Sequence, residues 1–519
     1  MTARLLARQS DIRFPRGALA LARCHAKEWG APRRCRGANK ESVSVDYVST
    51  RGQAAQLGFE DVLLAGLARD GGLFVPASWP RLSGEDLAAL AGLPYPQAAF
   101  RVLRPFVGDA FSDGEFTAML EGAYGSFAHP ATVPLVQVGA NDFLLELFHG
   151  PTLAFKDVAM QLLSRMMDHV LARSGKRITI VGATSGDTGA SAVEAFKGRE
   201  AVDVFILHPE GRVSEVQRRQ MTTVIDDNVH NIAIQGTFDD CQAIVKALFN
   251  DLDYRDRLAL AGINSINWAR VMAQSVYYAT AAATLGAPRR RVAFSVPTGN
   301  FGDVYAGRVA AHSGVPIDKL IVATNINDIL VRTLDSGVYQ PRGVHATQSP
   351  SMDIQVASNF ERLLFELAGR DGARIRDLMD GFAGKGSFAL DAAMLAAARQ
   401  GFLACRADEA ETTATIRDVH KRTGLTIDPH SAVGLTAAAK MRASGAIDAA
   451  TPLISLATAH PAKFPDAVEK ATGIRPRLPE RFADLFERAE KVDVLANDTA
   501  LVAAFIEKRA RAARNRAAE

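Results

Sequence analysis

The sequence is poor in cysteine and has no long uninterrupted apolar run. Four cysteines occur in 519 residues, and no two of them form a CxxC pair: Cys24, Cys35, Cys241 and Cys405. This spacing argues against a disulfide framework or a zinc site, since Cys24, His25 and Cys35 lack a fourth ligand at suitable spacing. No apolar stretch approaches the roughly 18–20 residues that a membrane-spanning helix needs. We therefore expect no membrane span and no metal site.

Three common motifs of nucleotide-binding proteins and hydrolases are also missing. The glycines of the segment 180–192 (IVGATSGDTGASA) do not follow GxGxxG, and no Gly-Lys pair closes a Walker A loop there. Asp428, His430 and Ser431 share one predicted turn, but no GxSxG element precedes a helix, so a serine hydrolase has little support. Hydride transfer with a dinucleotide lacks its fingerprint for the same reason.

The net charge of +3 is unevenly distributed. The first forty residues contain ten basic side chains against Asp11 and Glu28, which leaves 50 basic and 55 acidic residues in the rest of the chain. The main body therefore has no basic bias toward nucleic acid. The arginine-rich leader (1–44) is typical of a transit peptide, although it carries one serine, Ser10, in those forty residues. The alternatives are a disordered tail or a start codon assigned too far upstream, and we favour these because VDYVSTRG (45–52) looks like a domain beginning.

Beyond the leader, short β-branched or apolar runs alternate with segments of helical periodicity. The predicted strands are Phe143–Leu147, Ile178–Val181, Val204–Leu207, Val292–Val296, Leu320–Ala323 and Leu453–Leu456. The spacing of apolar residues over 156–172 predicts a helix that begins at Lys156. Strands alternating with helices predict an α/β fold with mainly parallel sheets, in which ligands bind at the carboxyl ends of the strands.

Three strand-to-helix junctions have the residues of a ligand site. In HGPTLAFKD (149–157), Lys156 is either a solvated first-turn residue or a buried amine kept for chemistry. The segments 180–192 and 295–307 (SVPTGNFGDVYAG) combine glycine with small polar residues, so their backbone N–H groups are suited to an anion. Ordinary turns with capping residues remain the alternative for both segments. His460, after the last predicted strand, taken alone is an ordinary packed or surface histidine.

These junctions together resemble the threonine synthase family. Five segments resemble blocks of that family, in the same order along the chain: HGPTLAFKD, GATSGDTGASA (182–192), TGNFGD (298–303), DPHSAVG (428–434) and TAHPAKF (458–464). YVSTRG (47–52) and SMDIQVASNFERLLFE (351–366) extend the match, so that it covers about 45–490.

The resemblance implies a pyridoxal-phosphate-dependent fold type II architecture, similar to tryptophan synthase β, with mainly parallel sheets flanked by helices. The division that we expect is a basic N-terminal extension (1–44), an N-terminal helical domain (45–130), a large cofactor-binding α/β domain (131–175 and 265–519), and a smaller α/β domain carrying the SGDTG loop (176–264).

The resemblance also assigns roles to individual residues. Lys156 would form the Schiff base with pyridoxal 5'-phosphate, because only an amine can do so and burial makes it nucleophilic. Five consecutive residues would surround the cofactor phosphate: Gly299, Asn300, Phe301, Gly302 and Asp303. Thr458 would meet the pyridine nitrogen. Four residues would contact the substrate carboxylate and the ring: Thr184, Ser185, Asp187 and Thr188. Asp187 stands where related enzymes of this fold type have asparagine.

The implied reaction converts O-phospho-L-homoserine and water into L-threonine and phosphate by γ-elimination and β-addition, with Lys156 shuttling protons. Candidate partners for the substrate phosphate are Arg212, Arg218, Arg270 and Arg362. Dehydration of serine or threonine with the same cofactor, and a binding protein that kept the fold, are the alternatives. We expect a cytoplasmic monomer or homodimer without nucleic-acid or membrane partners, or an organellar protein if the leader is a transit peptide.

Overall fold

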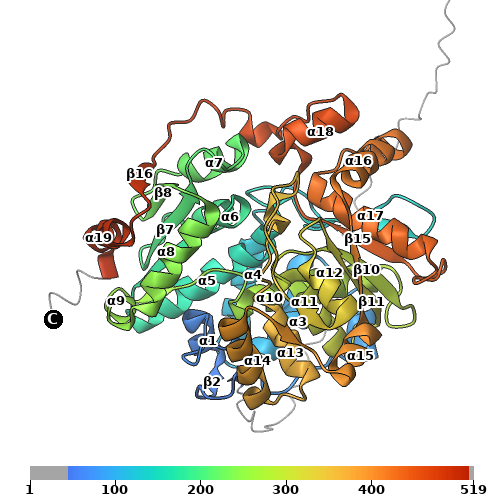
Figure 1. Cartoon of the computed structure of the whole chain (residues 1–519), viewed down its shortest axis with the longest axis horizontal. Coiled ribbons are helices and arrows are strands. Elements are labelled where there is room, and N and C mark those ends of the chain that lie inside the picture. Colours follow the sequence, from blue (N-terminus) through green and yellow to red (C-terminus); the bar gives the residue numbers. More distant parts are fainter. Residues whose placement is uncertain (1–44, 513–519) are drawn as a thin grey trace, which may run out of the picture. The chain divides into compact units, whose positions relative to one another are not determined.

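The computed structural model describes residues 45–512 (Figure 1). The predicted leader lies outside this range, and so do Cys24, His25 and Cys35. Within it, Cys241 and Cys405 are free thiols. No helix among the described residues is long and apolar enough to cross a membrane.

A six-stranded sheet forms the larger of the two main sheets. Its order is β14 (Phe402–Arg406), β11 (Ile317–Thr324), β10 (Val292–Pro297), β15 (Leu453–Ala457), β5 (Asp142–Glu146) and β4 (Leu135–Gln137). All neighbours are parallel except the hairpin of β4 and β5. Its central strands β10 and β15 are buried along their whole length, as expected for parallel strands covered by helices on both faces.

A five-stranded, fully parallel sheet is the smaller of the two main sheets. Its order is β16 (Asp493–Ala496), β8 (Val229–Gln235), β7 (Val202–Pro209), β6 (Ile178–Ala183) and β9 (Leu260–Ala261). The strand β7 (VDVFILHP) is buried at every position. In Figure 1 this sheet lies at the left, with α8 (Phe238–Asn250) and α19 (Thr499–Arg509) beside it.

The N-terminal part combines a small sheet with four helices. Strands β2 (Leu57–Gly58), β1 (Asp46–Ser49) and β3 (Phe74–Pro76) pair antiparallel. The helices are α1 (Phe59–Ala65), α2 (Gly84–Ala88), α3 (Tyr95–Val107) and α4 (Asp113–Tyr124). Their apolar side chains share one core with the six-stranded sheet, because Tyr47 and Phe106 both pack against Trp268.

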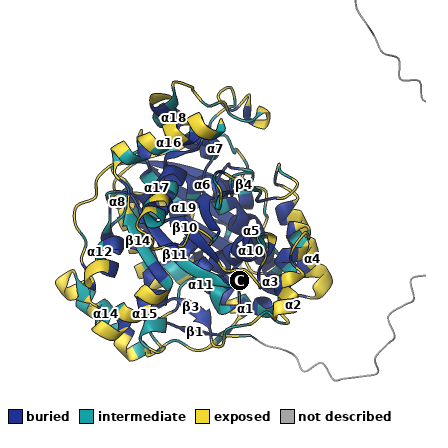
Figure 2. Cartoon of the chain, turned by 90° about the vertical axis from the view of Figure 1, so that its right-hand side faces the viewer, coloured by how far each residue is buried: buried dark blue, intermediate teal, exposed yellow. Residues whose placement is uncertain are grey.

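Two long helices with many buried residues, α5 (Lys156–Ser174) and α10 (Trp268–Thr284), pack against each other (Figure 2). The helices beside the five-stranded sheet include α6 (Asp187–Phe196), α7 (Glu215–Thr222) and α9 (Leu252–Arg257). The remaining elements are α11 (Gly302–His312), α12 (Ile329–Ser336), β12 (Val338–Tyr339), α13 (Phe360–Leu367), α14 (Gly372–Lys385), β13 (Phe388–Ala389), α15 (Ala392–Gly401), α16 (Glu409–Thr423), α17 (Pro429–Ala443) and α18 (Pro465–Thr472), with short 3-10 helices at Pro350–Met352, Pro461–Lys463 and Glu480–Phe482.

The predicted elements are confirmed. Five of the six predicted strands fall within an observed strand, the sixth (Phe143–Leu147) runs one residue past β5, and the predicted helix is α5, which begins at Lys156. The chain's end departs from the predicted division, which placed 265–519 in the large domain. Residues 493–496 form β16 on the five-stranded sheet, because β8 offers an open parallel edge there and α19 buries Val502 and Ile506 in the core of that sheet.

Candidate active site

Lys156 stands where the loop after β5 turns into α5. The loop runs beside the end of β15, since the Phe155 N–H donates to the Thr458 carbonyl at 2.8 Å and Ala154 forms an isolated bridge with Ala459. The Lys156 side chain is 12% exposed and its ammonium lies 3.7 Å from Asp187. Burial lowers the pKa of Lys156 to about 8, although Asp187 acts in the opposite direction. The amine can therefore lose its proton near neutral pH, as a buried amine kept for chemistry must.

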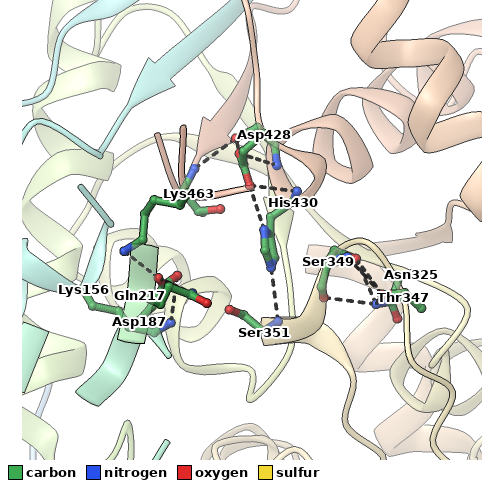
Figure 3. Close-up of polar contacts among 12 residues, drawn as sticks. Lys156, Asp187, Gln217, Asn325, Thr347, Ser349, Ser351, Asp428, His430 and Lys463 are labelled. Carbon is green, nitrogen blue, oxygen red and sulfur yellow. Dashed lines mark hydrogen bonds and ion pairs between the residues drawn. The ribbon is translucent and has the colours of Figure 1, made fainter. Parts of the chain in front are cut away.

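Asp187, the first residue of α6, lies between two lysines (Figure 3). Its Oδ1 is 2.7 Å from the ammonium of Lys463, and the Gln217 amide donates to the same oxygen at 2.8 Å. Burial alone would raise the pKa of Asp187, but the charges of Lys463 and Lys156 hold it well below its usual range. Asp187 is thus an ionised, fully paired carboxylate beside the reactive amine.

The turn before α6 and the first turn of that helix carry two hydroxyls without a protein partner among the described residues. Thr184 is buried, and its hydroxyl accepts hydrogen bonds from the N–H groups of Gly186 and Gly189 at 3.0 and 2.8 Å. The hydroxyls of Ser185 and Thr188 have no hydrogen-bond partner within residues 45–512, and both residues are partly exposed. Thr184 therefore shapes the turn, while the other two hydroxyls are left to bind a ligand.

The segment 299–303 forms a turn with a closely packed glycine before α11. A Cβ added at Gly299 would lie 2.8 Å from the Ser351 carbonyl oxygen, so a larger residue would displace the loop. Phe301 has φ 65° and packs against Phe360, while Asn300 accepts hydrogen bonds from the Ser358 N–H and hydroxyl. The α11 N-terminus at Gly302 has no side-chain cap, so its first N–H groups point toward the turn.

The Asp303 side chain is occupied by two tyrosines. Its carboxylate accepts hydrogen bonds from the hydroxyls of Tyr277 and Tyr278, and its Oδ2 is buried without a partner among the described residues. Burial raises the pKa of Asp303 to about 6, against the lowering effect of the two tyrosines. Any contact that Asp303 makes with an anion must therefore come from its main chain.

Thr458 follows β15 and is held by its backbone. Its N–H donates to the Ser431 hydroxyl at 3.2 Å, and that hydroxyl donates to Asp428. The same aspartate lies 2.7 Å from Nδ1 of His430, whose Nε2 accepts from the Ser351 N–H at 3.2 Å. A chain of hydrogen bonds thus joins Thr458 to the loop against Gly299, and Figure 3 shows the part of it that runs from Asp428 through His430 to Ser351. The Thr458 hydroxyl has no hydrogen-bond partner among residues 45–512.

The four candidate arginines differ in their surroundings. Arg362 is fully buried and bound to the carbonyls of Phe74 and Ile266, so it is structural. Arg218 is paired with Glu490, and Arg212 is exposed. Arg270 is buried, its Nη1 donates to the Ile263 carbonyl at 3.0 Å, and its Nε has no partner among the described residues. Burial lowers the pKa of Arg270 to about 10, and its charge in turn lowers the pKa of Lys156. Arg270 is therefore the candidate whose charge acts on Lys156.

Two residues of this site were missed by sequence reasoning, Lys463 and Gln217. Lys463 lies within the quoted segment TAHPAKF, where a lysine in an otherwise apolar stretch was the available signal. Gln217 carried no signal, because an amide in the first turns of a polar helix is typical of a solvated surface. His460 caps the 3-10 helix after it by accepting from the Ala462 N–H, and burial lowers its pKa to about 4.

The observed groups fit pyridoxal phosphate. A buried amine of lowered pKa can take up the aldehyde, the cradle at Gly299 with the uncapped α11 N-terminus suits the phosphate, and the Thr458 hydroxyl is without a protein partner. Within residues 45–512 no cluster of three or more histidine, cysteine or acidic side chains could hold a metal ion.

Comparisons with known proteins agree along most of the described chain. The family models that match are described as threonine synthase N terminus (46–124), pyridoxal-phosphate dependent enzyme (134–458) and threonine synthase, C-terminal (431–506). Threonine synthase of Pseudomonas aeruginosa is 54% identical over 461 residues, covering 89% of this chain and 97% of that protein.

Solved structures give the same result. The crystal structure of PLP-bound threonine synthase from Brucella melitensis is 56% identical, with TM-score 0.87, and covers 90% of this chain and 100% of that one. Threonine synthase from yeast is 39% identical, with TM-score 0.84, and covers 90% and 99%. The resemblance inferred from the motifs is confirmed, and so are the fold class and the dependence on pyridoxal phosphate. The chain belongs to the threonine synthase family of pyridoxal-phosphate-dependent enzymes.

Proposed function

We propose that the protein converts O-phospho-L-homoserine and water into L-threonine and phosphate. The observation that carries this proposal is the buried Lys156 amine, whose pKa is lowered to about 8, at the junction of β5 and α5. It lies 3.7 Å from Asp187, the first residue of α6, and its loop is bonded to Thr458. Three strand ends thus meet at one amine.

When bound, pyridoxal phosphate supplies an electron sink next to the α carbon of the amino acid. Lys156 would hold the cofactor, and its released amine would take and return protons at the α and β carbons. The main chain of Gly299–Asp303 and the α11 N-terminus would bind the cofactor phosphate. Thr458 would donate or accept a hydrogen bond at the ring nitrogen. A hydroxyl there favours a less fully protonated ring than a carboxylate would.

The substrate would be bound by groups on two elements. The free hydroxyls of Ser185 and Thr188 would donate to its carboxylate, while Thr184 keeps the turn in shape. Asp187, paired with Lys463, would stand at the ring side of the turn. Arg270 would bind the substrate phosphate, because its guanidinium is buried beside the site and keeps an unpaired Nε–H.

The test is turnover of O-phosphohomoserine by the cofactor-loaded protein. We expect phosphate release, with little keto acid formed from threonine, which separates the synthase from a dehydratase. Lys156→Ala should abolish both turnover and borohydride trapping of the cofactor. Arg270→Lys should retain trapping but raise KM by about tenfold, because a bidentate contact to phosphate is lost. Trapping at another residue, or no phosphate release by the loaded protein, would contradict the proposal.

We propose a cytoplasmic location and a monomeric or homodimeric state. An organellar location applies if residues 1–44 act as a transit peptide, and sequencing the mature N-terminus tests this. Sedimentation of the purified protein tests the oligomeric state.

A further inference from the structure

Lys463 is a second lysine in the same buried site, and none of the roles assigned above uses it. It ends the 3-10 helix Pro461–Lys463 that follows β15, and its side chain is 0% exposed. Its ammonium is 2.7 Å from Asp187 and donates to the Thr152 carbonyl at 2.8 Å. Removing an ammonium from water costs several kcal/mol, so such a group persists where it is closely paired.

The carboxylate of Asp187 is shared unequally between the two lysines. Lys463 approaches Oδ1 at 2.7 Å, and Gln217 donates to the same atom at 2.8 Å, whereas Lys156 stands 3.7 Å from Oδ2. Gly186 permits this arrangement, since a Cβ at that position would lie 2.4 Å from Cδ of Gln217. The carboxylate is therefore fixed by Lys463 and Gln217 and is only loosely paired with Lys156.

Charged groups reach Lys156 from every side of the site. Asp187 on α6 favours its protonated form, whereas Arg270 on α10 and Lys463 both disfavour it. Asp303 on α11 is engaged by two tyrosines, and its own pKa is raised to about 6. On α5 itself, Asp157 is bound by the N–H and hydroxyl of Thr152 and the hydroxyl of Ser191. Lys463 is thus the one cation among these that both repels a charge on Lys156 and occupies its nearest anion.

We propose that Lys463 is a positioning residue, which fixes the Asp187 carboxylate so that Lys156 does not form a tight ion pair with it and can release its proton. This inference rests on the proposed function, in which Lys156 must react as a neutral amine. Without Lys463, Asp187 is a buried anion whose nearest available cation is Lys156, and the pair that forms keeps Lys156 protonated.

The test measures how fast added pyridoxal phosphate becomes trapped on Lys156 by borohydride, at pH values from about 6 to about 10. Peptide mapping identifies the labelled lysine, and the readout is the pH at which the rate is half its maximum. In the unmodified full-length protein this midpoint is expected near 8. Lys463→Met should move it upward by about one pH unit, so that trapping near neutral pH slows by about tenfold.

Two further variants separate positioning from packing. Asp187→Asn removes the anion and should move the midpoint downward. The double variant Asp187→Asn with Lys463→Met carries no net charge change and should return to a midpoint close to that of the unmodified protein. Lys440→Met is the matched control, because Lys440 is also ion-paired, to Glu411, and is not among the charges that act on Lys156. It should leave the midpoint unchanged.

The outcomes are distinct. A purely structural Lys463 predicts lower thermal stability for Lys463→Met with an unmoved midpoint, and that result would overturn the inference. If Lys463→Met does not fold, Lys463→Gln carries the test, since it removes the charge that holds Asp187 and keeps an amide that can donate to the Thr152 carbonyl. It should also move the midpoint upward, and an unmoved midpoint in Lys463→Gln would overturn the inference. A protein without label at Lys156 even in its unmodified form contradicts the proposed function itself.

Discussion

At the scale of single residues, burial and the charged partners of each group together set the ionisation of the site. Lys156 and Asp303 are both buried, and in each the charged form is disfavoured, which lowers the pKa of the amine and raises that of the carboxyl. Asp187 is equally buried, yet it stays ionised because two ammonium groups face it. Burial by itself therefore does not set the charge state; the partners of each group do.

Asp303 gives a stability prediction with a defined sign. Its pKa is about 6 in the folded protein, against about 4 in an unfolded chain. Between these values the folded state binds more protons, so the contribution of this group to the free energy of unfolding falls as pH rises from about 4 to about 6. Asp303→Asn should remove that fall. Relative to the unmodified protein, the variant should gain roughly 2 kcal/mol between pH 4.5 and pH 7.5, measured by denaturant unfolding of the cofactor-free protein. A difference between the two proteins that does not change with pH would contradict the raised pKa.

The residues of the site were predictable to different degrees. Lys156 and Asp187 were found because each follows the end of a predicted strand, where glycines and hydroxyl residues indicate a ligand turn. Lys463 was not, because a charged residue after a proline is typical of a solvated turn, and only the tertiary structure brings it to Asp187. The place of Asp303 beside the cofactor phosphate stays a prediction, and its carboxylate faces Tyr277 and Tyr278, which the motif did not indicate.

At the scale of elements, the N-terminus of α17 connects two sides of the cofactor site. Asp428 is fully buried and caps the helix by accepting from the N–H groups of His430 and Ser431 at 2.9 and 3.1 Å. The His430 ring leads to the Ser351 N–H, and the Ser431 hydroxyl leads to the Thr458 N–H. One carboxylate thus fixes the loop against Gly299 on one side and Thr458 on the other.

Removing this carboxylate should cost far more than removing an ordinary cap. Asp428→Ala loses the cap and leaves buried donors of His430 and Ser431 without a partner, so we expect a loss of about 3 kcal/mol or more in the free energy of unfolding. Ser112→Ala is the control, since Ser112 caps α4 in an exposed capping box, and it should cost about 1 kcal/mol. Denaturant unfolding measures both. Equal losses would mean that the network around Asp428 contributes nothing beyond the cap.

Strands were predictable from the sequence where their hydrophobic pattern agreed with their burial in the folded protein. Long apolar runs such as those of β7 and β10 are buried on both faces and have a strong signal. The strand β8 (VHNIAIQ) contains His230 and Asn231, which interrupt its apolar pattern although both are buried. The strand β16 has an exposed Val494 and pairs along one edge only, with β8, so its formation depends on that neighbour rather than on its own sequence.

At the scale of the whole described chain, the C-terminal segment crosses from one sheet to the other. After α18 it passes the loop that precedes Lys156, where Arg481 donates to the Gly150 carbonyl at 2.8 Å and Phe482 and Leu485 pack with Leu153. It then reaches the five-stranded sheet through β16 and α19. The loop that carries Lys156 is therefore supported from the C-terminal end of the chain.

Near the end of the described chain, Arg511 makes a bidentate contact with Asp203. Arg511 donates through its backbone N–H and its Nε to the two carboxylate oxygens of Asp203, both at 2.7 Å, and Asp203 on β7 is 2% exposed. Arg511→Ala leaves that buried carboxylate without its ion-pair partner. Since the Arg511 side chain is 34% exposed, its attraction to Asp203 is partly screened, and we expect a loss of about 2 kcal/mol.

Arg257, which pairs with a residue of the C-terminal helix α19, provides the matched control for Arg511→Ala. Arg257 pairs with Glu507 on α19, and both side chains are 46% exposed, so Arg257→Ala should cost less than about 1 kcal/mol. Denaturant unfolding gives the two losses, and hydrogen exchange should show faster opening of β7 and β8 in Arg511→Ala alone. If the two arginine variants lose the same stability, Asp203 is adequately solvated without Arg511, and the end of the chain does not secure the sheet. If Arg511→Ala instead speeds hydrogen exchange only in α19, that helix detaches without disturbing β7. The five-stranded sheet is then supported by β16 and not by Arg511.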